Sequence, residues 1–309
     1  MPRQLPPSCR FSFDRRTILT FLGATAATSL LPTPLRAEID PDWTAILPPF
    51  RIAGNLYYVG SRDLASYLIT TPQGHILINS NLVTSPPQIR AGVEKLDFHW
   101  RDVKILLISH AHFDHCAGSA QIKHETGARF MVMDADVSDV ESGGAKNFAF
   151  GRQEGILPYP AAKVDRILHD GDQVHLGDTT LVAHKTAGHT KGCTTWTMQV
   201  TDNGQTCNVV IVGSPNVLSS YNLIDDPKYP QMAADFEQQF RTLKALPCDI
   251  FLGAHGGYYD MLAKYEHLKA GDTHAFVDPT GYQTFVARSE QNFRAELAKQ
   301  QSRKPPHPV

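Results

Sequence analysis

Short apolar segments, separated by Gly, Pro and Asn, follow one another along the chain from residue 52 onward. Runs of four to eight residues that are rich in Val, Ile, Leu and Tyr and bounded by turn residues are typical of β-strands. Helices are expected at Pro87–Leu96 and at Gly118–Glu125, where Gly127 would end the second helix. Strands of the first half are predicted at Ile52–Val59, Ala65–Thr70, His75–Asn79, Val103–Ile108 and Arg129–Met133.

The second half repeats this order of strands followed by a helix, which is predicted at Gln231–Leu246. Two further helices, at Met261–Lys269 and Gly281–Lys299, close the chain. Such halves predict an α/β fold of the four-layer αβ/βα sandwich type, in which two sheets stack face to face with helices outside. We expect residues 38–309 to form this single domain from two similar halves. Strands of the second half are predicted at Gln173–Leu176, Thr180–Lys185, Cys193–Val200, Cys207–Val212 and Asp249–Leu252.

One long connection, Ser142–Ala162, carries glycines and aromatic residues between the two halves. A loop of this length in a compact chain indicates a binding role. Aromatic rings in the loop and near the N-terminus could form walls around a ligand, although ordinary packing is the alternative for each ring. These aromatic residues are Trp43, Phe50, Phe148, Phe150 and Tyr159.

The first 37 residues have the layout of a cleaved export signal. Arg15 and Arg16 precede an apolar run, Thr17–Leu31, whose 15 residues fall short of the roughly 20 needed to cross a bilayer. The paired arginines resemble a twin-arginine signal, and an ordinary secretory signal is the alternative. Cleavage after Ala37 would deliver the chain to the periplasm without a membrane segment.

Composition and charge favour a globular protein with a small-molecule substrate. Hydrophobic residues make up 42% of the chain, which is enough for a packed core. Loss of the signal would remove five arginines and one aspartate and leave a mildly acidic protein without basic runs. Such a surface argues against nucleic acid as a partner. We expect the mature protein to be a monomer.

Four side chains that commonly bind metal ions follow the strand predicted at Val103–Ile108: His110, His112, Asp114 and His115. Alternate side chains of an extended segment point the same way, so the first two histidines could hold one metal and the Asp-His pair a neighbouring one. Neutral imidazole and carboxylate without thiolate pairs suit Zn²⁺, which also tolerates an open position for water. The motif therefore predicts a catalytic zinc site.

Two metals need about six protein ligands, so at least two more must come from elsewhere in the chain. His189 and His255 each follow a predicted strand closely, as the motif itself does. The other histidines fall within predicted strands, helices or turns, or in the C-terminal part, where packing or solvation accounts for them better. His189 and His255 are therefore the candidates for the missing ligands.

The pattern His110-x-His112-x-Asp114-His115 resembles the signature of the metallo-β-lactamase superfamily. The segments "AGHTKGCTTW", "GS" and "GAHGG" further resemble the third subclass of class B β-lactamases. Most other members of the superfamily carry a Gly-Asp pair, whose aspartate bridges both metals, where this chain has Gly213-Ser214. The resemblance therefore implies two Zn²⁺ ions without a bridging carboxylate. Their implied ligands are His110, His112 and His189 for the first zinc and Asp114, His115 and His255 for the second.

The resemblance also implies an activity: opening of the β-lactam ring of penicillins, cephalosporins and carbapenems, which gives antibiotic resistance. A zinc-bound hydroxide, oriented by Asp114, would attack the lactam carbonyl. The first zinc would polarise the carbonyl oxygen and the second would stabilise the amide nitrogen as it leaves. The alternatives are an exported dizinc hydrolase of lactones or other esters and a non-catalytic periplasmic zinc-binding protein.

Ser214 is a candidate for binding the substrate. If Asn203-Gly204 is a two-residue hairpin turn, Val200 faces Cys207 and Cys193 faces Ser214, which places the serine beside the zinc site. A hydroxyl there can donate a hydrogen bond to the carboxylate that β-lactams carry. Asn216 and Tyr221 lie on the same loop and could share this task.

Two further features bear on the site. Cys193 and Cys207 would lie too far apart along the hairpin for a disulfide, and Cys116 is interpreted as a small buried residue at the start of a helix. Asn79 stands where many relatives carry an aspartate. An effect of Asn79 on the metals would be indirect, through the hydrogen bonds around the ligands.

Overall fold

Two β-sheets form the centre of the folded body, which begins after Leu35. The computed structural model describes residues 39–151, 159–202 and 204–303, so the predicted export signal over residues 1–37 lies outside the described residues. The first sheet contains β1 to β7 in chain order, and the second has the order β12-β11-β10-β9-β8.

The first sheet is antiparallel from β1 to β4 and parallel from β4 to β7. The prediction of one strand over Ile52–Val59 is wrong, because Gly54 turns the chain with a φ of 50° and separates two short strands. The strands of the first sheet are β1 (Phe50–Ala53), β2 (Leu56–Tyr58), β3 (Tyr67–Thr71), β4 (Gly74–Ile78), β5 (Val103–Leu107), β6 (Arg129–Met133) and β7 (Arg166–Leu168).

The second sheet is built around the long hairpin of β10 and β11. Val200 pairs with Cys207 and Asp202 with Gln205, which confirms the register predicted from a two-residue turn. Strand β12 then joins β11 in parallel. The strands are β8 (Gln173–Leu176), β9 (Thr179–Lys185), β10 (Thr194–Asp202), β11 (Gln205–Val212) and β12 (Ile250–Gly253).

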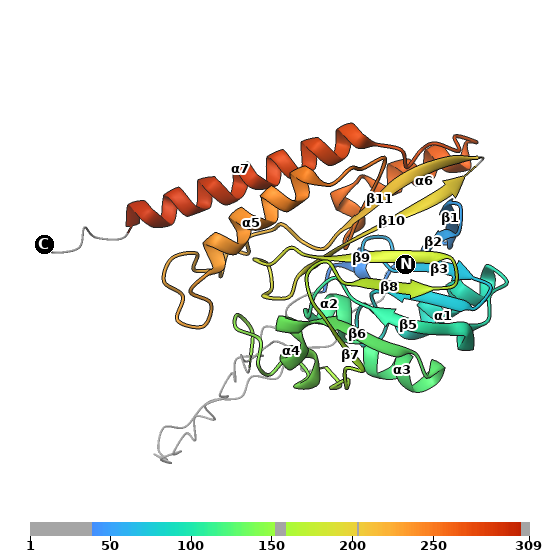
Figure 1. Cartoon of the computed structure of the whole chain (residues 1–309), viewed down its shortest axis with the longest axis horizontal. Coiled ribbons are helices and arrows are strands. Elements are labelled where there is room, and N and C mark those ends of the chain that lie inside the picture. The colour runs from blue at the N-terminus through green and yellow to red at the C-terminus, as the bar shows by residue number, and fades with distance from the viewer. Residues whose placement is uncertain (1–38, 152–158, 203, 304–309) are drawn as a thin grey trace, which may run out of the picture. The chain divides into compact units, whose positions relative to one another are not determined.

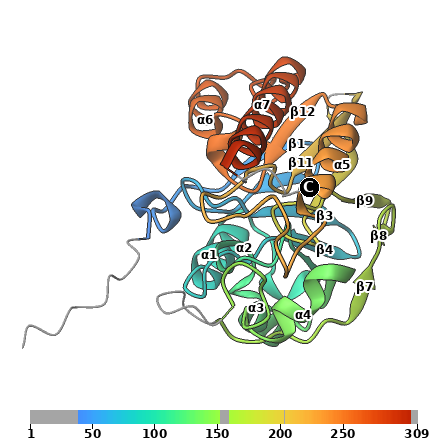
Figure 2. The ribbon, with the colours of Figure 1, turned by 90° about the vertical axis from the view of Figure 1, so that its left-hand side faces the viewer.

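Helices cover the outer face of each sheet (Figures 1 and 2). The first sheet carries α1 (Pro86–Lys95), α2 (Phe113–Cys116), α3 (Ser119–Thr126) and α4 (Val137–Glu141). The second sheet carries α5 (Met232–Ala245), α6 (Met261–Lys269) and α7 (Pro279–Arg303). Single turns of 3₁₀ helix are η1 (Pro41–Trp43), η2 (Trp100–Asp102), η3 (Asp134–Asp136) and η4 (Gly256–Tyr258).

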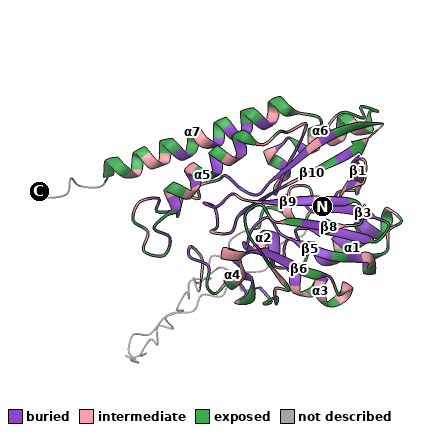
Figure 3. Ribbon diagram, viewed as in Figure 1, coloured by how far each residue is buried: buried purple, intermediate pink, exposed green. Residues whose placement is uncertain are grey.

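Strand β4, near the middle of the first sheet, is buried on both faces, as a strand between two layers must be. In β4, Ile76 and Ile78 join the hydrophobic cluster that continues into the second sheet, whereas Leu77 joins the cluster beneath α1 and α3. Figure 3 shows the same distribution, with buried strands and a largely exposed α7. The predicted four-layer αβ/βα sandwich is confirmed.

The four cysteines within the described residues carry free thiols. Cys193 Sγ lies 3.6 Å from the carbonyl oxygen of Ser214, beside the end of the hairpin, while Cys207 pairs seven positions further along β10 with Val200. Cys248 is half-buried. No helix among the described residues is both long and apolar enough to span a bilayer.

Candidate metal centre

The six predicted ligands come together at one edge of the two sheets. His110 follows the C-terminal end of β5, and α2 carries Asp114 and His115 one turn later. His189 lies in the connection from β9 to β10, and His255 follows the C-terminal end of β12. Strand ends therefore place side chains that are up to 145 positions apart in the chain at a common site.

His110, His112 and His189 form the first group. Their ring centroids are 4.7 to 4.8 Å apart, and one ligand nitrogen from each lies within 4.8 Å of the others. Within the described residues, the Nε2 atoms of His110 and His112 are buried and have no hydrogen-bond partner. Burial without a partner is costly for a polar atom, so a metal ion fits this group.

Burial also keeps these imidazoles neutral. It lowers the pKa of His110 and His112 well below the usual value and lowers the pKa of His189 to about 4. Neighbouring imidazoles reinforce the effect at each of the three rings. Because a metal binds the neutral ring, these three side chains are ready to ligate at neutral pH.

Asp114, His115 and His255 form the second group. His115 Nε2 lies 3.1 Å from Asp114 Oδ2 and 3.2 Å from His255 Nε2, and the last two atoms are 3.5 Å apart. Ligand atoms about 2.0–2.1 Å from a tetrahedral zinc are separated by about 3.3 Å, so this triangle fits one zinc ion. Asp114 and His115 also lie within 4.8 Å of a ligand nitrogen of His110, which makes the two groups neighbours.

Electrostatics favour a cation at the second group. Burial opposes the charge on His255, but hydrogen bonds to Asp114 and Asp63 outweigh it and raise its pKa to about 9. Burial likewise opposes ionisation of Asp114, yet His115 and His255 hold its pKa well below the usual value. Two carboxylates therefore draw positive charge to this position, which a zinc ion can supply in place of the proton.

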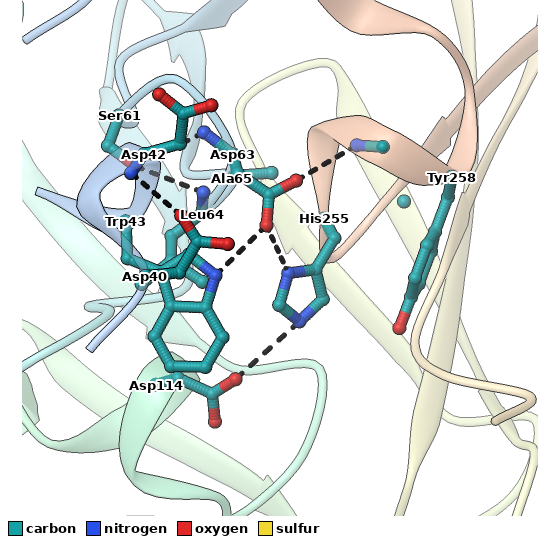
Figure 4. A network of polar contacts seen from close by, with 12 residues as sticks. Asp40, Asp42, Trp43, Ser61, Asp63, Leu64, Ala65, Asp114, His255 and Tyr258 are labelled. Carbon is teal, nitrogen blue, oxygen red and sulfur yellow. Dashed lines mark hydrogen bonds and ion pairs between the residues drawn. The ribbon is translucent and has the colours of Figure 1, made fainter. Parts of the chain in front are cut away.

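Asp63 is a functional residue that sequence reasoning missed. Its Oδ2 accepts a hydrogen bond of 2.7 Å from His255 Nδ1, which turns Nε2 of the same ring toward Asp114 (Figure 4). Asp63 lies on the turn before β3, 192 positions from His255. No sequence motif around Asp63 indicates that it would contact a metal-binding histidine. A carboxylate behind a ligating histidine is a common arrangement in zinc sites.

Asp136 was missed as well, although it joins the two ligand-bearing loops. Its Oδ2 accepts hydrogen bonds of 2.8 Å from the backbone of Ala111 and from Thr190 Oγ1. Its Oδ1 accepts one of 2.8 Å from Gly192 N. A Cβ at Gly192 would lie 2.7 Å from this carboxylate, so only glycine allows the approach.

The three predicted substrate-binding residues lie next to the second-sheet side of the site. Ser214 is fully buried, and its Oγ lies 3.1 Å from the hydroxyl of Tyr258. Asn216 is exposed, and its Nδ2 donates to the same hydroxyl at 3.0 Å. Tyr221 is buried and donates to the carbonyl oxygen of His189 at 2.6 Å. Contact of these residues with a substrate stays a prediction.

The candidate wall residues divide into two kinds. Phe50 is part of the core, stacked on Tyr58 at 5.2 Å, so the alternative of ordinary packing holds for this ring. Phe148 and Tyr159 are buried too. In contrast, Phe150 lies 5.1 Å from the ring of His112 and Trp43 lies 5.8 Å from that of His255, both half-buried.

Cys116 is in neither group of candidate ligand atoms, and backbone groups occupy the side chain of Asn79. Asn79 Oδ1 accepts from Ser109 N at 2.8 Å, and its Nδ2 donates to the carbonyl oxygen of Ala65. The left-handed backbone of Asn79, with a φ of 67°, suits asparagine. Asn79 therefore supports the loop that begins at Ser109, one residue before the first ligand.

Comparison with known proteins agrees with this geometry. The family profile described as the metallo-beta-lactamase superfamily matches residues 62–202. Among solved structures, the chain is similar to the native FEZ-1 metallo-beta-lactamase from Legionella gormanii, with 50% identity and a TM-score of 0.82 over 83% of this chain and 98% of that one. It is also similar to LRA-12, a class B3 di-zinc metallo-beta-lactamase from an Alaskan soil metagenome. That match has 34% identity and a TM-score of 0.79 over 83% of this chain and 96% of the other.

A more distant relative has a less specific name. A metal-dependent hydrolase from Anaeromyxobacter dehalogenans is 25% identical over 244 residues, which cover 75% of this chain and 78% of the relative.

Proposed function

Because the chain belongs to the metallo-β-lactamase superfamily, we propose that it is a dizinc hydrolase that opens the β-lactam ring of penicillins, cephalosporins and carbapenems. The similarity to two β-lactamases, one of them a di-zinc enzyme, supports this substrate class. The distant metal-dependent hydrolase names no substrate. For that reason, an exported hydrolase of lactones or other esters is the second candidate.

The observation that carries the proposal is the pair of ligand groups. Three imidazoles, two of which have a buried Nε2 without a hydrogen-bond partner among the described residues, stand beside a triangle of one carboxylate and two imidazoles. Oxygen and nitrogen ligands in sets of three, without thiolates, are typical of catalytic zinc. We therefore assign His110, His112 and His189 to one zinc and Asp114, His115 and His255 to a second.

The residues of the chain hold and orient the reactants. When bound, two zinc ions supply a water that is nucleophilic at neutral pH and an electrophile for the lactam carbonyl. Asp114 is the only carboxylate among the six ligands, so it is the group able to accept a hydrogen bond from the attacking water. No serine or cysteine needs to act as a nucleophile in this scheme.

Substrate recognition would use the Tyr258 hydroxyl and its two neighbours. Asn216 is the exposed member of this group, and Ser214 lies behind it. Their amide and hydroxyl groups can donate hydrogen bonds to the carboxylate of a β-lactam. Tyr221 supports the site differently, because its hydroxyl already holds the backbone of His189.

Export completes the proposal. An enzyme that protects a bacterium from β-lactams acts where those drugs meet their targets, and residues 1–37 are typical of a signal that leads to the periplasm. The mature protein would be a monomer acting on a small molecule.

The proposal can be tested with purified mature protein and two histidine variants. Wild type should hydrolyse a chromogenic cephalosporin and a carbapenem faster than a panel of lactones, lose activity to a chelator, and regain it with zinc. His189→Ala should reduce activity by at least a hundredfold. His184→Ala is the matched control, because His184 lies in β9 and contacts Thr197 at 2.9 Å instead. Preference for the lactones would favour the second candidate, and no zinc-dependent hydrolysis would refute both.

A further inference from the structure

The segment before the first sheet is fastened to the turn that carries Asp63. Arg62 Nε pairs with Asp42 Oδ1 at 2.9 Å, and Arg62 N donates to the carbonyl oxygen of Ala45 at 3.1 Å. Ile46 forms an isolated β-bridge with Ser61. We call residues 40–46, which include η1, the N-terminal arm. Its contacts hold Trp43 over the second group of ligands.

Trp43 makes a directed contact there. Its indole Nε1 donates to Asp63 Oδ2 at 3.1 Å, the same oxygen that accepts from His255 Nδ1 at 2.7 Å (Figure 4). Its ring also lies 5.8 Å from that of His255 and 6.1 Å from that of Phe113, which precedes Asp114. The indole thus touches both the carboxylate and the imidazole behind the second metal position.

The other contacts of Asp63 restrain the carboxylate from the opposite side. Gly257 N donates to Oδ1 at 3.0 Å, and Gly256 N donates to the backbone oxygen of Asp63 at 2.6 Å. Each carboxylate oxygen therefore has its own fixed donor besides His255. Removal of the indole N–H would leave His255 as the only hydrogen-bond partner of Oδ2 given above. The carboxylate could then pivot about the hydrogen bond between Oδ1 and Gly257 N.

We propose that Trp43 is a positioning residue for the second zinc, acting through Asp63 on His255, so that the N-terminal arm is part of that metal site. This inference rests on the proposed dizinc function and extends it to a residue outside the ligand set. Partners behind a ligating histidine typically change metal affinity by about 10–100-fold. Trp43 acts one hydrogen bond further out, so an effect of about tenfold is expected.

The test measures zinc affinity rather than catalysis. Full-length mature protein is stripped of metal and titrated with zinc against a competing chelator, which yields two dissociation constants. His255→Ala identifies the binding step that belongs to the second site. Trp43→Phe keeps an aromatic ring but removes the N–H together with the second ring of the indole, and Asp63→Asn tests the link between indole and histidine.

We expect Trp43→Phe to weaken zinc binding at the second site, identified by His255→Ala, about tenfold. The dissociation constant of the other site should change by less than twofold. Asp63→Asn should weaken the same step by about 10–100-fold. Trp100→Phe is the matched control, because Trp100 Nε1 donates to Glu125 Oε2 at 2.8 Å on the outer helical layer. It should change neither step.

Equal affinities in Trp43→Phe and wild type would overturn the inference, as would equal weakening of both steps. Either result leaves the proposed function intact if wild type binds two zinc ions and hydrolyses β-lactams. Wild type that binds fewer than two zinc ions would overturn the proposed function and this inference together.

Discussion

Two histidines of the candidate metal centre, His189 and His255, bind a protein partner through Nδ1 and leave Nε2 for a metal ion. His189 Nδ1 donates to the carbonyl oxygen of Asn216 at 2.7 Å, and His255 Nδ1 donates to Asp63 at 2.7 Å. These bonds select the tautomer in which Nε2 carries no proton. Single side chains around the ligands should therefore control either metal affinity or substrate binding, and variants can separate the two.

Substrate binding should depend on Asn216 more than on Ser214, because only Asn216 is exposed. Asn216→Ala removes one donor that acts equally on bound substrate and transition state, so KM should rise roughly two- to tenfold with kcat nearly unchanged. Ser214→Ala should raise KM by less while keeping both zinc ions. Steady-state kinetics on a cephalosporin, with zinc content measured alongside, check this. A collapse of kcat in either variant would mean that the side chain serves the chemistry.

Stability should depend on Asp136, because three donors converge on its buried carboxylate. In Asp136→Asn one oxygen becomes an NH₂ group that faces another donor, so the free energy of unfolding should fall by about 1–3 kcal/mol. Urea denaturation of metal-free protein measures the loss. Asp134→Asn is the control, because Asp134 is about one-third exposed where it pairs with Lys185. A loss in Asp134→Asn as large as that in Asp136→Asn would contradict this assignment.

Helix α7 begins at a cap that also satisfies a nearly buried lysine. Asp278 Oδ1 accepts from Gly281 N at 2.7 Å, and Oδ2 lies 2.8 Å from Lys264 Nζ. Asp278→Ala should therefore destabilise the protein at pH 7 by about 1–2 kcal/mol, the usual worth of a cap. Chemical denaturation of the variant and wild type gives this difference.

The same cap predicts how the difference varies with pH. Burial opposes ionisation of Asp278, but Lys264 and Gly281 N outweigh it and lower the pKa of the carboxyl. A lowered pKa in the folded state contributes stability that is present above the unfolded pKa of about 3.9 and is lost as pH falls through the folded value. The gap between wild type and Asp278→Ala should thus shrink below pH 4. A gap that widens in acid would contradict the assigned charge.

Some elements could be predicted from sequence because local rules determine them. The pairing of Val200 with Cys207 follows from a two-residue turn and the alternation of a hairpin, and the motif from His110 to His115 follows its strand directly. The break between β1 and β2 was not predicted, because the turn at Gly54 lies within an apolar run. The contacts of Asp63 and Asp136 could not be predicted, because their hydrogen-bond partners become neighbours only after folding.

At the level of the whole protein, the proposed mechanism needs no covalent intermediate on the chain. Mechanism-based inhibitors of serine β-lactamases should therefore leave hydrolysis unchanged after long incubation. Mass spectrometry of the incubated protein checks for an adduct. A stable adduct on Ser214 would contradict the zinc mechanism.

In the proposed mechanism, two groups of three ligands hold two zinc ions, and these ions make the protein a β-lactamase. A titration of metal-free mature protein with zinc, followed simultaneously by metal content and by cephalosporin hydrolysis, tests it most directly. Metal content and hydrolysis should rise together and saturate at two zinc ions per chain. Full hydrolysis without zinc, or two bound zinc ions without β-lactam hydrolysis, would contradict it.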